Sequence, residues 1–319
     1  MRAIVTGGAG FIGSHLVDAL VRAGNPVLVI DDLSTGREAN LEAALAEGTD
    51  VMRLDIRNGA ALREAFVGFH PEVVFHLAAQ IDVRVSMAEP SRDAEINVVG
   101  SINVFSAAAA SGARRVINTS TGGAIYGEGA PLPTPETTTG RPLSAYGLSK
   151  QTAEQYAGWF RRMHDLDVIT LRYGNVYGPR QDPTGDAGVV AIFCSRLLAG
   201  LRPMIFGDGK QTRDYVFVRD IVAANLAAAG AQGLAHSIFN IGTGCEVSVA
   251  ELVTAVAQAA GVDPALFQPE MRPPRAGEVL RSCLDIARAR KELHLDELTP
   301  LHDGLKATLD WIRQRQPVS

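Results

Sequence analysis

The chain contains few of the residues that build cross-linked or metal-bound structures. Its 319 residues include three cysteines, Cys194, Cys245 and Cys283, which are odd in number and widely spaced. Such a set predicts neither a disulfide framework nor a zinc site, so each cysteine is expected to be a small buried apolar residue. The seven histidines are scattered, with no i, i+4 pair, and no metal site is expected.

Other absences narrow the range of partners. No apolar run reaches the ~18 residues that a membrane span needs. The net charge is −5 and there is no basic tail or block, which argues against a nucleic-acid partner. Because the first predicted strand begins at residue 2, there is no room for a signal peptide. We therefore expect a cytoplasmic protein that is not attached to a membrane.

The order of the apolar runs in the first half is typical of an α/β protein. Strands are expected at 2–6, 26–30, 51–55, 72–77, 115–119 and 168–172, and helices at 11–23, 61–69, 92–111 and 145–164. Strands that alternate with helices predict a Rossmann-like, doubly wound parallel sheet with right-handed crossovers. The ligand of such a sheet lies at the carboxyl ends of the strands.

The pattern changes near residue 176, and a chain of this length holds about two domains. The second half is expected to contain helices at 189–199, 220–229, 248–260 and 302–315, and strands at 203–207, 215–218 and 237–241. The last of these strands is expected to return to the main sheet. We therefore expect a first domain over 1–175 with returning segments at about 215–245. A smaller C-terminal α/β domain would cover 176–319, mainly 176–214 and 246–319.

A glycine-rich turn follows the first strand directly. Gly7, Gly10 and Gly13 have the spacing G-x-x-G-x-x-G, and a helix is expected to begin near Phe11 and Ile12. Glycine permits a tight turn and lets a ligand approach the backbone closely. The free N–H groups and the positive end of the helix dipole then face that ligand. The turn predicts a pyrophosphate site, although such glycines are weak support without their structural context.

The context comes from the end of the second strand. Asp31 and Asp32 lie there, 18 residues beyond Gly13. An acidic residue at this place suits the ribose hydroxyls of NAD and repels the 2′-phosphate of NADP. The alternative is a solvated turn before Leu33. With the glycines at this spacing, the pattern favours NAD and an NAD-binding first domain.

Tyr146 and Lys150 lie four residues apart at the start of a predicted helix, so they share one helix face. A free tyrosine has a pKa near ~10 and is a poor base at neutral pH. A nearby ammonium and an oxidised nicotinamide ring both favour the phenolate, and a lowered pKa would make Tyr146 a general base. Thr121, beside Ser120 at the end of the fifth strand, can share the proton. The alternatives are an ordinary helix and a Ser/Thr turn that caps the strand.

Together these motifs resemble those of the extended short-chain dehydrogenase/reductase family, in particular its UDP-glucose (UDP-galactose) 4-epimerase type. The resemblance covers residues 1 to about 312. It is carried by Thr6-Gly-Gly-Ala-Gly-Phe-Ile-Gly13, Asp31-Asp32, Leu54-Asp55-Ile56, His76-Leu-Ala-Ala-Gln80, Ser120-Thr-Gly-Gly-Ala-Ile-Tyr-Gly127, Tyr146-x-x-x-Lys150 and Arg172-Tyr-Gly-Asn-Val-Tyr-Gly-Pro179. It implies NAD as cofactor, a UDP-sugar as substrate, and a homodimer joined through the helices at 92–111 and 145–164.

The resemblance also implies a role for each matching residue. The catalytic residues would be Thr121, Tyr146 and Lys150. The cofactor would be bound by Gly7, Gly10, Phe11, Ile12 and Gly13 at the pyrophosphate, Asp31 and Asp32 at the ribose, Asp55 and Ile56 at the adenine, and Leu77, Ala78, Ala79, Gln80 and Tyr173 toward the nicotinamide, with Tyr146 and Lys150. The substrate would be bound by Arg84, Ser120, Thr121, Asn175, Val189, Phe206, Arg213, Arg275 and Glu278.

The implied reaction is a reversible epimerisation at C4 of UDP-glucose or UDP-galactose through a 4-keto sugar. A UDP-glucuronate 4-epimerase is the main alternative, because Arg84 or Arg196 could approach C6 of the sugar. Relatives that use a hexuronate often have R-x-R after Y-G-P, however, and here Asp182 replaces the second arginine. A 4,6-dehydratase would carry Asp-Glu after Thr121, where this chain has Gly122-Gly123. An NAD-binding protein without activity is disfavoured by the intact Thr121, Tyr146 and Lys150.

Overall fold

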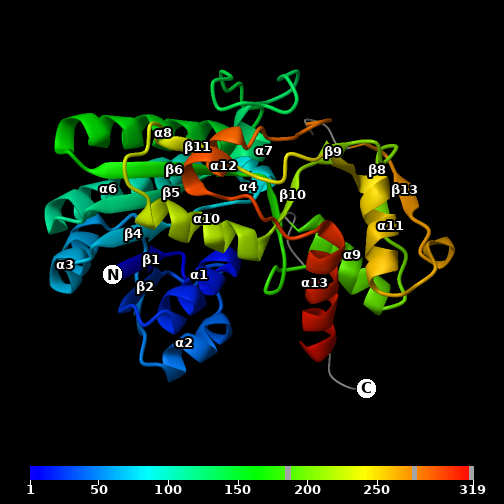
Figure 1. Ribbon diagram of the computed structural model, residues 1–319, viewed down its shortest axis with the longest axis horizontal. Coiled ribbons are helices and arrows are strands. Elements are labelled where there is room, and N and C mark those ends of the chain that lie inside the picture. Colours follow the sequence, from blue (N-terminus) through cyan, green and yellow to red (C-terminus); the bar gives the residue numbers. More distant parts are fainter. Residues whose placement is uncertain (184–187, 275–278, 316–319) are drawn as a thin grey trace.

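A parallel seven-stranded sheet lies in the part of the molecule that contains the N-terminus (Figure 1). The computed structural model describes residues 1–183, 188–274 and 279–315. The strand order is β11-β6-β5-β4-β1-β2-β3, and every neighbouring pair is parallel. The strands are β1 (Ala3–Thr6), β2 (Val27–Asp31), β3 (Asp50–Arg53), β4 (Val73–His76), β5 (Arg115–Thr121), β6 (Asp167–Tyr173) and β11 (Ile238–Ile241).

Helices cover both faces of this sheet. One face carries α1 (Phe11–Arg22), α2 (Glu42–Ala46) and α10 (Val218–Gly230), and the other carries α3 (Gly59–Phe69), α6 (Gly100–Ser111) and α8 (Ala145–His164) (Figure 1). Because both faces are covered, the inner strands are buried at nearly every position and do not alternate between buried and exposed residues. β1, for example, is buried at all four positions.

The second unit packs three helices against short strand pairs. Its helices are α9 (Val189–Leu198), α11 (Val249–Ala259) and α13 (Leu301–Arg315). Its pairs are β7 (Asn175–Tyr177) with β10 (Tyr215–Phe217), β8 (Met204–Phe206) with β13 (Glu270–Arg272), and β9 (Thr212–Arg213) with β12 (Val247–Ser248). The core of this unit is separate from the two cores that flank the sheet, and Phe193 and Leu252 lie in it.

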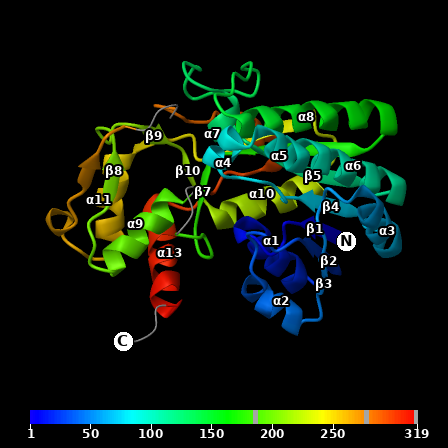
Figure 2. The ribbon, with the colours of Figure 1, turned by 180° about the vertical axis from the view of Figure 1, so that it is seen from behind.

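Short helices occupy the connections near the carboxyl edge of the sheet. They are α4 (Val83–Ala88), α5 (Pro90–Ala94), the π-helical turn η2 (Glu95–Val99) and α7 (Gly122–Ile125). Figure 2 shows α4, α5 and α7 beside α8. The remaining short elements are η1 (Glu38–Leu41), η3 (Pro264–Leu266) and α12 (Ala287–Leu293), which packs against β11.

The expected fold class is confirmed, and β11 joins the sheet beside β6 as expected of a returning strand. The helix expected at 92–111 is different, because it begins at Pro90 and is interrupted by η2. The strand expected at 215–218 ends at Phe217, and α10 begins at Val218. Cys245 is exposed, contrary to expectation, whereas Cys194 and Cys283 are buried. Within the described ranges, no helix has both the length and the apolar character of a membrane span.

Candidate active site

The glycine-rich turn forms a close-packed cradle at the start of α1. Gly7 has a φ of 70°, and a Cβ there would lie 2.6 Å from the backbone nitrogen of Ala78. A Cβ on Gly13 would lie 2.1 Å from the carbonyl oxygen of Gly7. Gly10 is the N-cap of α1. Among the described residues, no side chain caps the backbone N–H groups at this end of the helix. First-turn N–H groups without a cap suit a diphosphate, so this cradle fits the pyrophosphate of NAD.

Asp31 ties this cradle to the loop after β2. Its Oδ2 accepts from the backbone of Ala9 at 2.9 Å and its Oδ1 from the backbone of Leu33 at 2.9 Å. A carboxylate has about four acceptor positions, so ribose hydroxyls could still donate to it. Asp32 is exposed and accepts from the backbone and hydroxyl of Ser34. The structure therefore gives Asp31 the buried position at the cradle and Asp32 a position in the following turn.

The two residues predicted at the adenine have different surroundings. The carboxylate of Asp55 is bound by Arg57 through Oδ2, at 2.9 Å from Nε and 2.5 Å from Nη2, which holds the pKa of that carboxyl below its usual value. The Ile56 side chain is buried in the core, and a Cβ on Gly100 would lie 2.6 Å from its Cδ1. Contact between Ile56 and an adenine ring would therefore involve mainly its backbone.

The segment after β4 is half-buried and is held by a polar network. The backbone N–H of Gln80 donates to Asn97 Oδ1, and Asn97 Nδ2 donates to the Gln80 carbonyl, both at 2.9 Å. Asp93 accepts from Gln80 Nε2 at 2.8 Å and from Asn97 Nδ2 at 3.0 Å. Leu77, Ala78 and Ala79 precede this fixed point. The network positions the four residues predicted to line the cofactor, which are Leu77, Ala78, Ala79 and Gln80.

Thr121, at the end of β5, lies close enough to Tyr146, at the start of α8, for the threonine hydroxyl to act on the pKa of the phenol. Ser144 caps α8 by accepting from the backbone of Gly147 at 3.1 Å, which fixes the start of the helix. Lys150 lies one turn further along and is 3% exposed. The three predicted catalytic residues thus meet at the carboxyl edge of the sheet.

The electrostatics of this trio correct one expectation. Burial and the charge of Asp93 raise the pKa of Tyr146 to about 12, and the nearby Thr121 hydroxyl acts in the opposite direction. Burial lowers the pKa of Lys150 to about 8, against the charges of Glu154 and Asp93. The protein groups alone therefore do not lower the pKa of the phenol. The sequence analysis named two positive groups that could favour the phenolate, the Lys150 ammonium and the oxidised nicotinamide ring. The lowering of the phenol pKa is therefore left to the nicotinamide ring.

Asn175 and Val189 lie on the substrate side of the trio. A Cβ on Gly123 would lie 3.5 Å from Asn175 Oδ1 and 3.9 Å from Thr121 Oγ1, so Gly123 leaves the space between them open. Asn175 and Val189 also line a common small cavity with Tyr215. Ser120 is buried beside Thr121, and its hydroxyl has no hydrogen-bond partner among the described residues.

The other predicted substrate residues are more scattered. Arg213 lies in β9 and donates to the Thr212 carbonyl at 2.8 Å, and Phe206 is half-buried at the end of β8. Arg84 lies in α4 and is exposed, 3.8 Å from Asp82. Arg84, Phe206 and Arg213 therefore lie on three further elements, whereas the predicted catalytic residues lie on β5 and α8. Arg275 and Glu278 lie outside the described residues.

Tyr173, which is predicted to lie near the nicotinamide, is the last residue of β6 and is buried. Its hydroxyl lies 3.3 Å from Thr119 Oγ1 and accepts from Asn225 Nδ2 at 2.7 Å, and its ring packs in the core on the α10 side. The reason is that β6 is covered on both faces, so this side chain points into a core. Its backbone is the part left at the edge of the sheet.

Sequence reasoning missed several buried polar residues behind the trio, which are Asp93, Asn97, Glu154 and Arg172. Glu154 follows Lys150 by four residues, so its position on the same helix face could have been read from the sequence. The positions of Asp93 and Asn97 could not be read from the sequence, because both residues bond to Gln80, which is distant in the chain.

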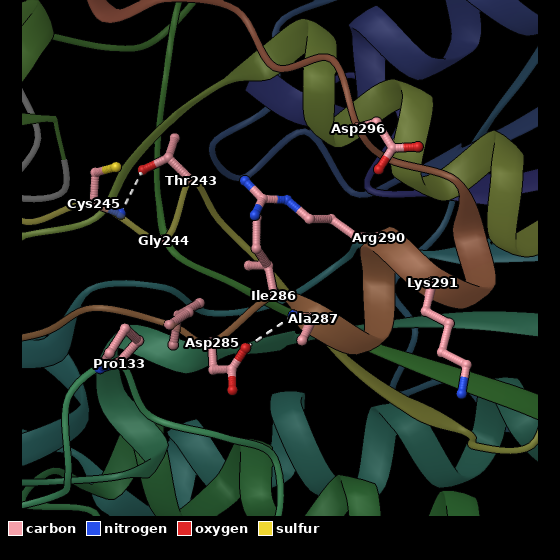
Figure 3. Close-up of a pocket in the computed structure, with 11 residues that line it drawn as sticks. Pro133, Thr243, Gly244, Cys245, Asp285, Ile286, Ala287, Arg290, Lys291 and Asp296 are labelled. Carbon is pink, nitrogen blue, oxygen red and sulfur yellow. Dashed lines mark hydrogen bonds between the residues drawn. The ribbon is translucent and has the colours of Figure 1, made fainter.

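A cavity of about 590 Å³ lies away from this site, between the loop after β11 and α12 (Figure 3). Thr243, Cys245, Arg290 and Lys291 are among its lining residues, and none of the predicted catalytic residues lines it. Because the predicted catalytic residues do not line it, this cavity is not the candidate active site. Within the described ranges, no group of three or more acidic, histidine or cysteine side chains could hold a metal ion.

Known proteins resemble the whole chain. The family model described as "NAD dependent epimerase/dehydratase family" matches residues 3–242. A UDP-glucose 4-epimerase of Mycolicibacterium smegmatis is 46% identical over 316 residues, which cover 99% of each chain. The crystal structure of a Thermotoga maritima UDP-glucose 4-epimerase with UDP-glucose has a TM-score of 0.93 at 43% identity, covering 98% of this chain and 99% of that one. That of a Thermus thermophilus UDP-glucose 4-epimerase with NAD has a TM-score of 0.87 at 39% identity, covering 99% and 100%. The chain therefore belongs to the NAD dependent epimerase/dehydratase family.

Proposed function

We propose that this protein is an NAD-dependent enzyme that interconverts UDP-glucose and UDP-galactose by inverting C4. The observation that carries the proposal is the placement of Thr121 beside the phenol of Tyr146, one helical turn from Lys150, at the same sheet edge as the uncapped start of α1. The similar proteins support it, because those described above are UDP-glucose 4-epimerases over the full length of this chain.

The chain's own groups would move the proton. Tyr146 takes the proton of the 4-hydroxyl, and Thr121 holds that hydroxyl and the phenol in one hydrogen-bonded relay. Lys150 places a buried ammonium one helical turn beyond the phenol, and the positive nicotinamide ring, when bound, would supply the charge that favours the phenolate. The chemistry supplied by NAD⁺, when bound in the cradle, is to take up the hydride of C4 and return it to the opposite face. Since this leaves the cofactor oxidised after each turnover, the cradle has to retain it.

Inversion requires that the sugar turns while its nucleotide stays fixed. Arg213 and Arg275 would hold the diphosphate, because a guanidinium group binds phosphate oxygens in pairs. Glu278 would hold the uridine ribose. The open space at Gly123, between Thr121 and Asn175, leaves room for the hexose ring. Anchoring one end of the substrate keeps both faces of the ring within reach of Tyr146.

The residues around the site favour a neutral hexose. Asp182 takes the place where an arginine would bind a hexuronate, and its carboxylate faces Arg37 at 2.9 Å. Gly122 and Gly123 provide no carboxylate to eliminate water, and a Cβ on Gly122 would lie 2.6 Å from Leu284. A dehydratase with Asp-Glu at these positions would therefore need a different packing.

The test is direct. The purified protein is incubated separately with UDP-glucose, UDP-glucuronate and UDP-N-acetylglucosamine, and the products are resolved by chromatography. UDP-galactose is expected from UDP-glucose, and Tyr146→Phe should abolish its formation while the bound NAD stays at the wild-type level. Conversion of UDP-glucuronate alone would replace the proposed substrate, and full activity of Tyr146→Phe would remove Tyr146 as the base.

We further propose a homodimer in the cytoplasm. The outer face of α8 exposes a stripe at helical spacing, Leu148, Tyr156, Trp159 and Met163, and Met87 and Val99 are exposed on the neighbouring α4 and η2. Large apolar side chains gathered on one face mark an interaction surface, and the same helices of a second copy would cover it. Sedimentation should give twice the mass of the chain, and Trp159→Glu with Met163→Glu should give a monomer.

The three free cysteines suit a reducing compartment.

A further inference from the structure

The loop that follows β7 leaves the second unit and returns to α1, the helix that begins at the cradle. Pro179 and Arg180 lie in this loop. His15 Nε2 donates to the Pro179 carbonyl at 2.8 Å, and Arg180 Nη2 donates to Asp18 Oδ2 at 2.7 Å. His15 and Asp18 both belong to α1. These two contacts, here called the joint, therefore connect the substrate side of the molecule to the cofactor helix.

The ion pair of the joint is buried. The side chains of Arg180 and Asp18 are 17% and 9% exposed, so solvent screens their attraction only weakly. Arg180 Nη1 and Asp18 Oδ1 have no hydrogen-bond partner among the described residues. Loss of either side chain would therefore leave the charge of the other buried without its partner, which is unfavourable.

Arg180 also has an unusual backbone conformation. Its φ is 69°, in the left-handed region that residues other than glycine seldom adopt. Such a conformation costs free energy and persists only where surrounding contacts compensate for it, and it is frequent at functional sites. The bond with Asp18 is one such contact. The backbone of this loop is thus held in the form that directs the Arg180 side chain to α1.

The next residue, Gln181, holds the same loop to β7. Its Nε2 donates to the Val176 carbonyl at 2.9 Å, and Val176 follows Asn175, a predicted substrate residue, in β7. Gln181 and Asn175 both line the small cavity beside Val189. One short loop therefore contacts the cofactor helix through Arg180 and the substrate strand through Gln181.

Apolar side chains of α1 reach the second unit as well. Phe11 and Ile12, in the first turn of α1, pack against the core of that unit. Apolar contact has no preferred direction, whereas a hydrogen-bonded ion pair favours one geometry. The apolar contact can therefore hold the two units together, while the joint can determine how they are placed relative to each other.

We propose that Arg180 is a positioning residue, which through its bond with Asp18 fixes the substrate strand β7 relative to the cofactor cradle. The inference rests on the proposed function, because it assigns what keeps C4 of the sugar in line with the nicotinamide. Reacting atoms have to lie about 3–3.5 Å apart, and a displacement of about 1 Å can slow a reaction about 10²-fold. Loss of the joint should therefore lower kcat much more than it raises KM.

The test compares Asp18→Asn, Arg180→Gln and the double variant with wild type, each with its bound NAD quantified. We expect kcat per bound NAD to fall about tenfold or more, while KM for UDP-glucose changes less than about threefold. The double variant should be no slower than the single variants, because each single change already breaks the same bond. It also leaves no unpaired buried charge, so it serves as the test if a single variant does not fold.

The matched control is Asp167→Asn, which takes the same kind of carboxylate from another buried arginine, Arg115, at 2.6 Å. These residues begin β6 and β5, at the edge of the sheet opposite the site. The control should lose stability but keep the wild-type kcat per bound NAD. An equal fall of kcat in the control would show that the joint acts through stability alone and would overturn the proposal. Wild-type kcat in the double variant would overturn it too.

A second measurement needs no turnover. Hydrogen exchange is followed by mass spectrometry on the NAD-loaded proteins, without any sugar nucleotide. Asp18→Asn, although it lies on α1, should raise exchange at 175–177 in β7, and Asp167→Asn should not. Unchanged exchange at β7 would overturn the proposal. If wild type does not convert UDP-glucose but exchange at β7 rises as expected, the proposed function fails while the positioning role of Arg180 stands.

Discussion

Arg172 on β6 holds the carboxylate of Glu154 on α8 through two hydrogen bonds, 2.9 Å from Nε to Oε1 and 2.5 Å from Nη2 to Oε2. Both side chains are buried, and Arg172 Nη1 also donates to the hydroxyl of Tyr126 at 2.9 Å. The pair locks the helix that carries Tyr146 and Lys150 onto the central sheet. Since β6 is an inner strand, the position of the candidate catalytic residues depends on this pair.

Glu154→Gln should therefore destabilise the protein strongly. It leaves the Arg172 guanidinium buried without its counter-charge, which costs about 3–5 kcal/mol in comparable buried pairs. The free energy of unfolding is measured by urea titration with circular dichroism. Asp310→Asn, which breaks an exposed pair with Arg313, is the control and should change stability by less than about 1 kcal/mol. Equal stability of Glu154→Gln and wild type would show that the pair does not support the helix.

Gly7→Ala should lose the bound cofactor as well as stability. The added Cβ would lie 2.6 Å from the Ala78 nitrogen, and the residue would keep an unfavourable φ of 70°. Gly24→Ala is a matched control, because Gly24 has a φ of 72° but no atom within 4 Å of the added Cβ. In Gly24→Ala, only the left-handed backbone conformation lowers the free energy of unfolding, by about 1–2 kcal/mol. NAD released from each purified protein is quantified by absorbance, and equal NAD in both would contradict the cradle.

Thr121→Val should slow turnover while Thr121→Ser retains most of it. Valine keeps the shape but removes the hydroxyl that lowers the pKa of Tyr146, so this pKa should rise further above its usual value. Loss of one proton-relay group costs about 10²-fold or more in kcat. Initial rates with UDP-glucose give kcat and KM separately, and KM should change little. Wild-type kcat in Thr121→Val would exclude the threonine from the relay.

The parts predicted well from the sequence are those that short local patterns determine. The glycine turn and α1 follow from Gly7, Gly10 and Gly13 with the apolar residues after them, and α8 has the predicted bounds of 145–164. The shared face of Tyr146 and Lys150 follows from their spacing alone. These features need no knowledge of distant segments.

The parts that were missed depend on distant contacts. The helix around Asp93 and Asn97 widens into a π-helical turn while both residues bond to Gln80, which no local pattern indicates. The pKa of Tyr146 depends on how deeply α8 is buried, so the spacing of Tyr146 and Lys150 could not predict its direction. The hydrogen bonds of the Tyr173 hydroxyl with Thr119 and Asn225 also join segments far apart in the chain, which the sequence does not indicate.

His76 gives a prediction about acid stability. Its pKa is lowered to about 3 by burial, whereas the unfolded chain should have the ordinary value near ~6.5. Between these two values the unfolded state binds a proton that the folded state does not, so stability falls as the pH falls. The loss is about 1.4 kcal/mol per pH unit across that window, or about 2 kcal/mol between pH 6.5 and pH 5.

The measurement is urea unfolding of wild type and His76→Gln at pH 7 and pH 5. Glutamine can still meet Thr6 and Ser101 but does not titrate, so this part of the pH dependence should disappear. His70→Gln is the control, because His70 is not buried, and its removal should leave the wild-type pH dependence in place. If His76→Gln loses as much stability as wild type between the two pH values, protonation of His76 is not what destabilises the fold in acid.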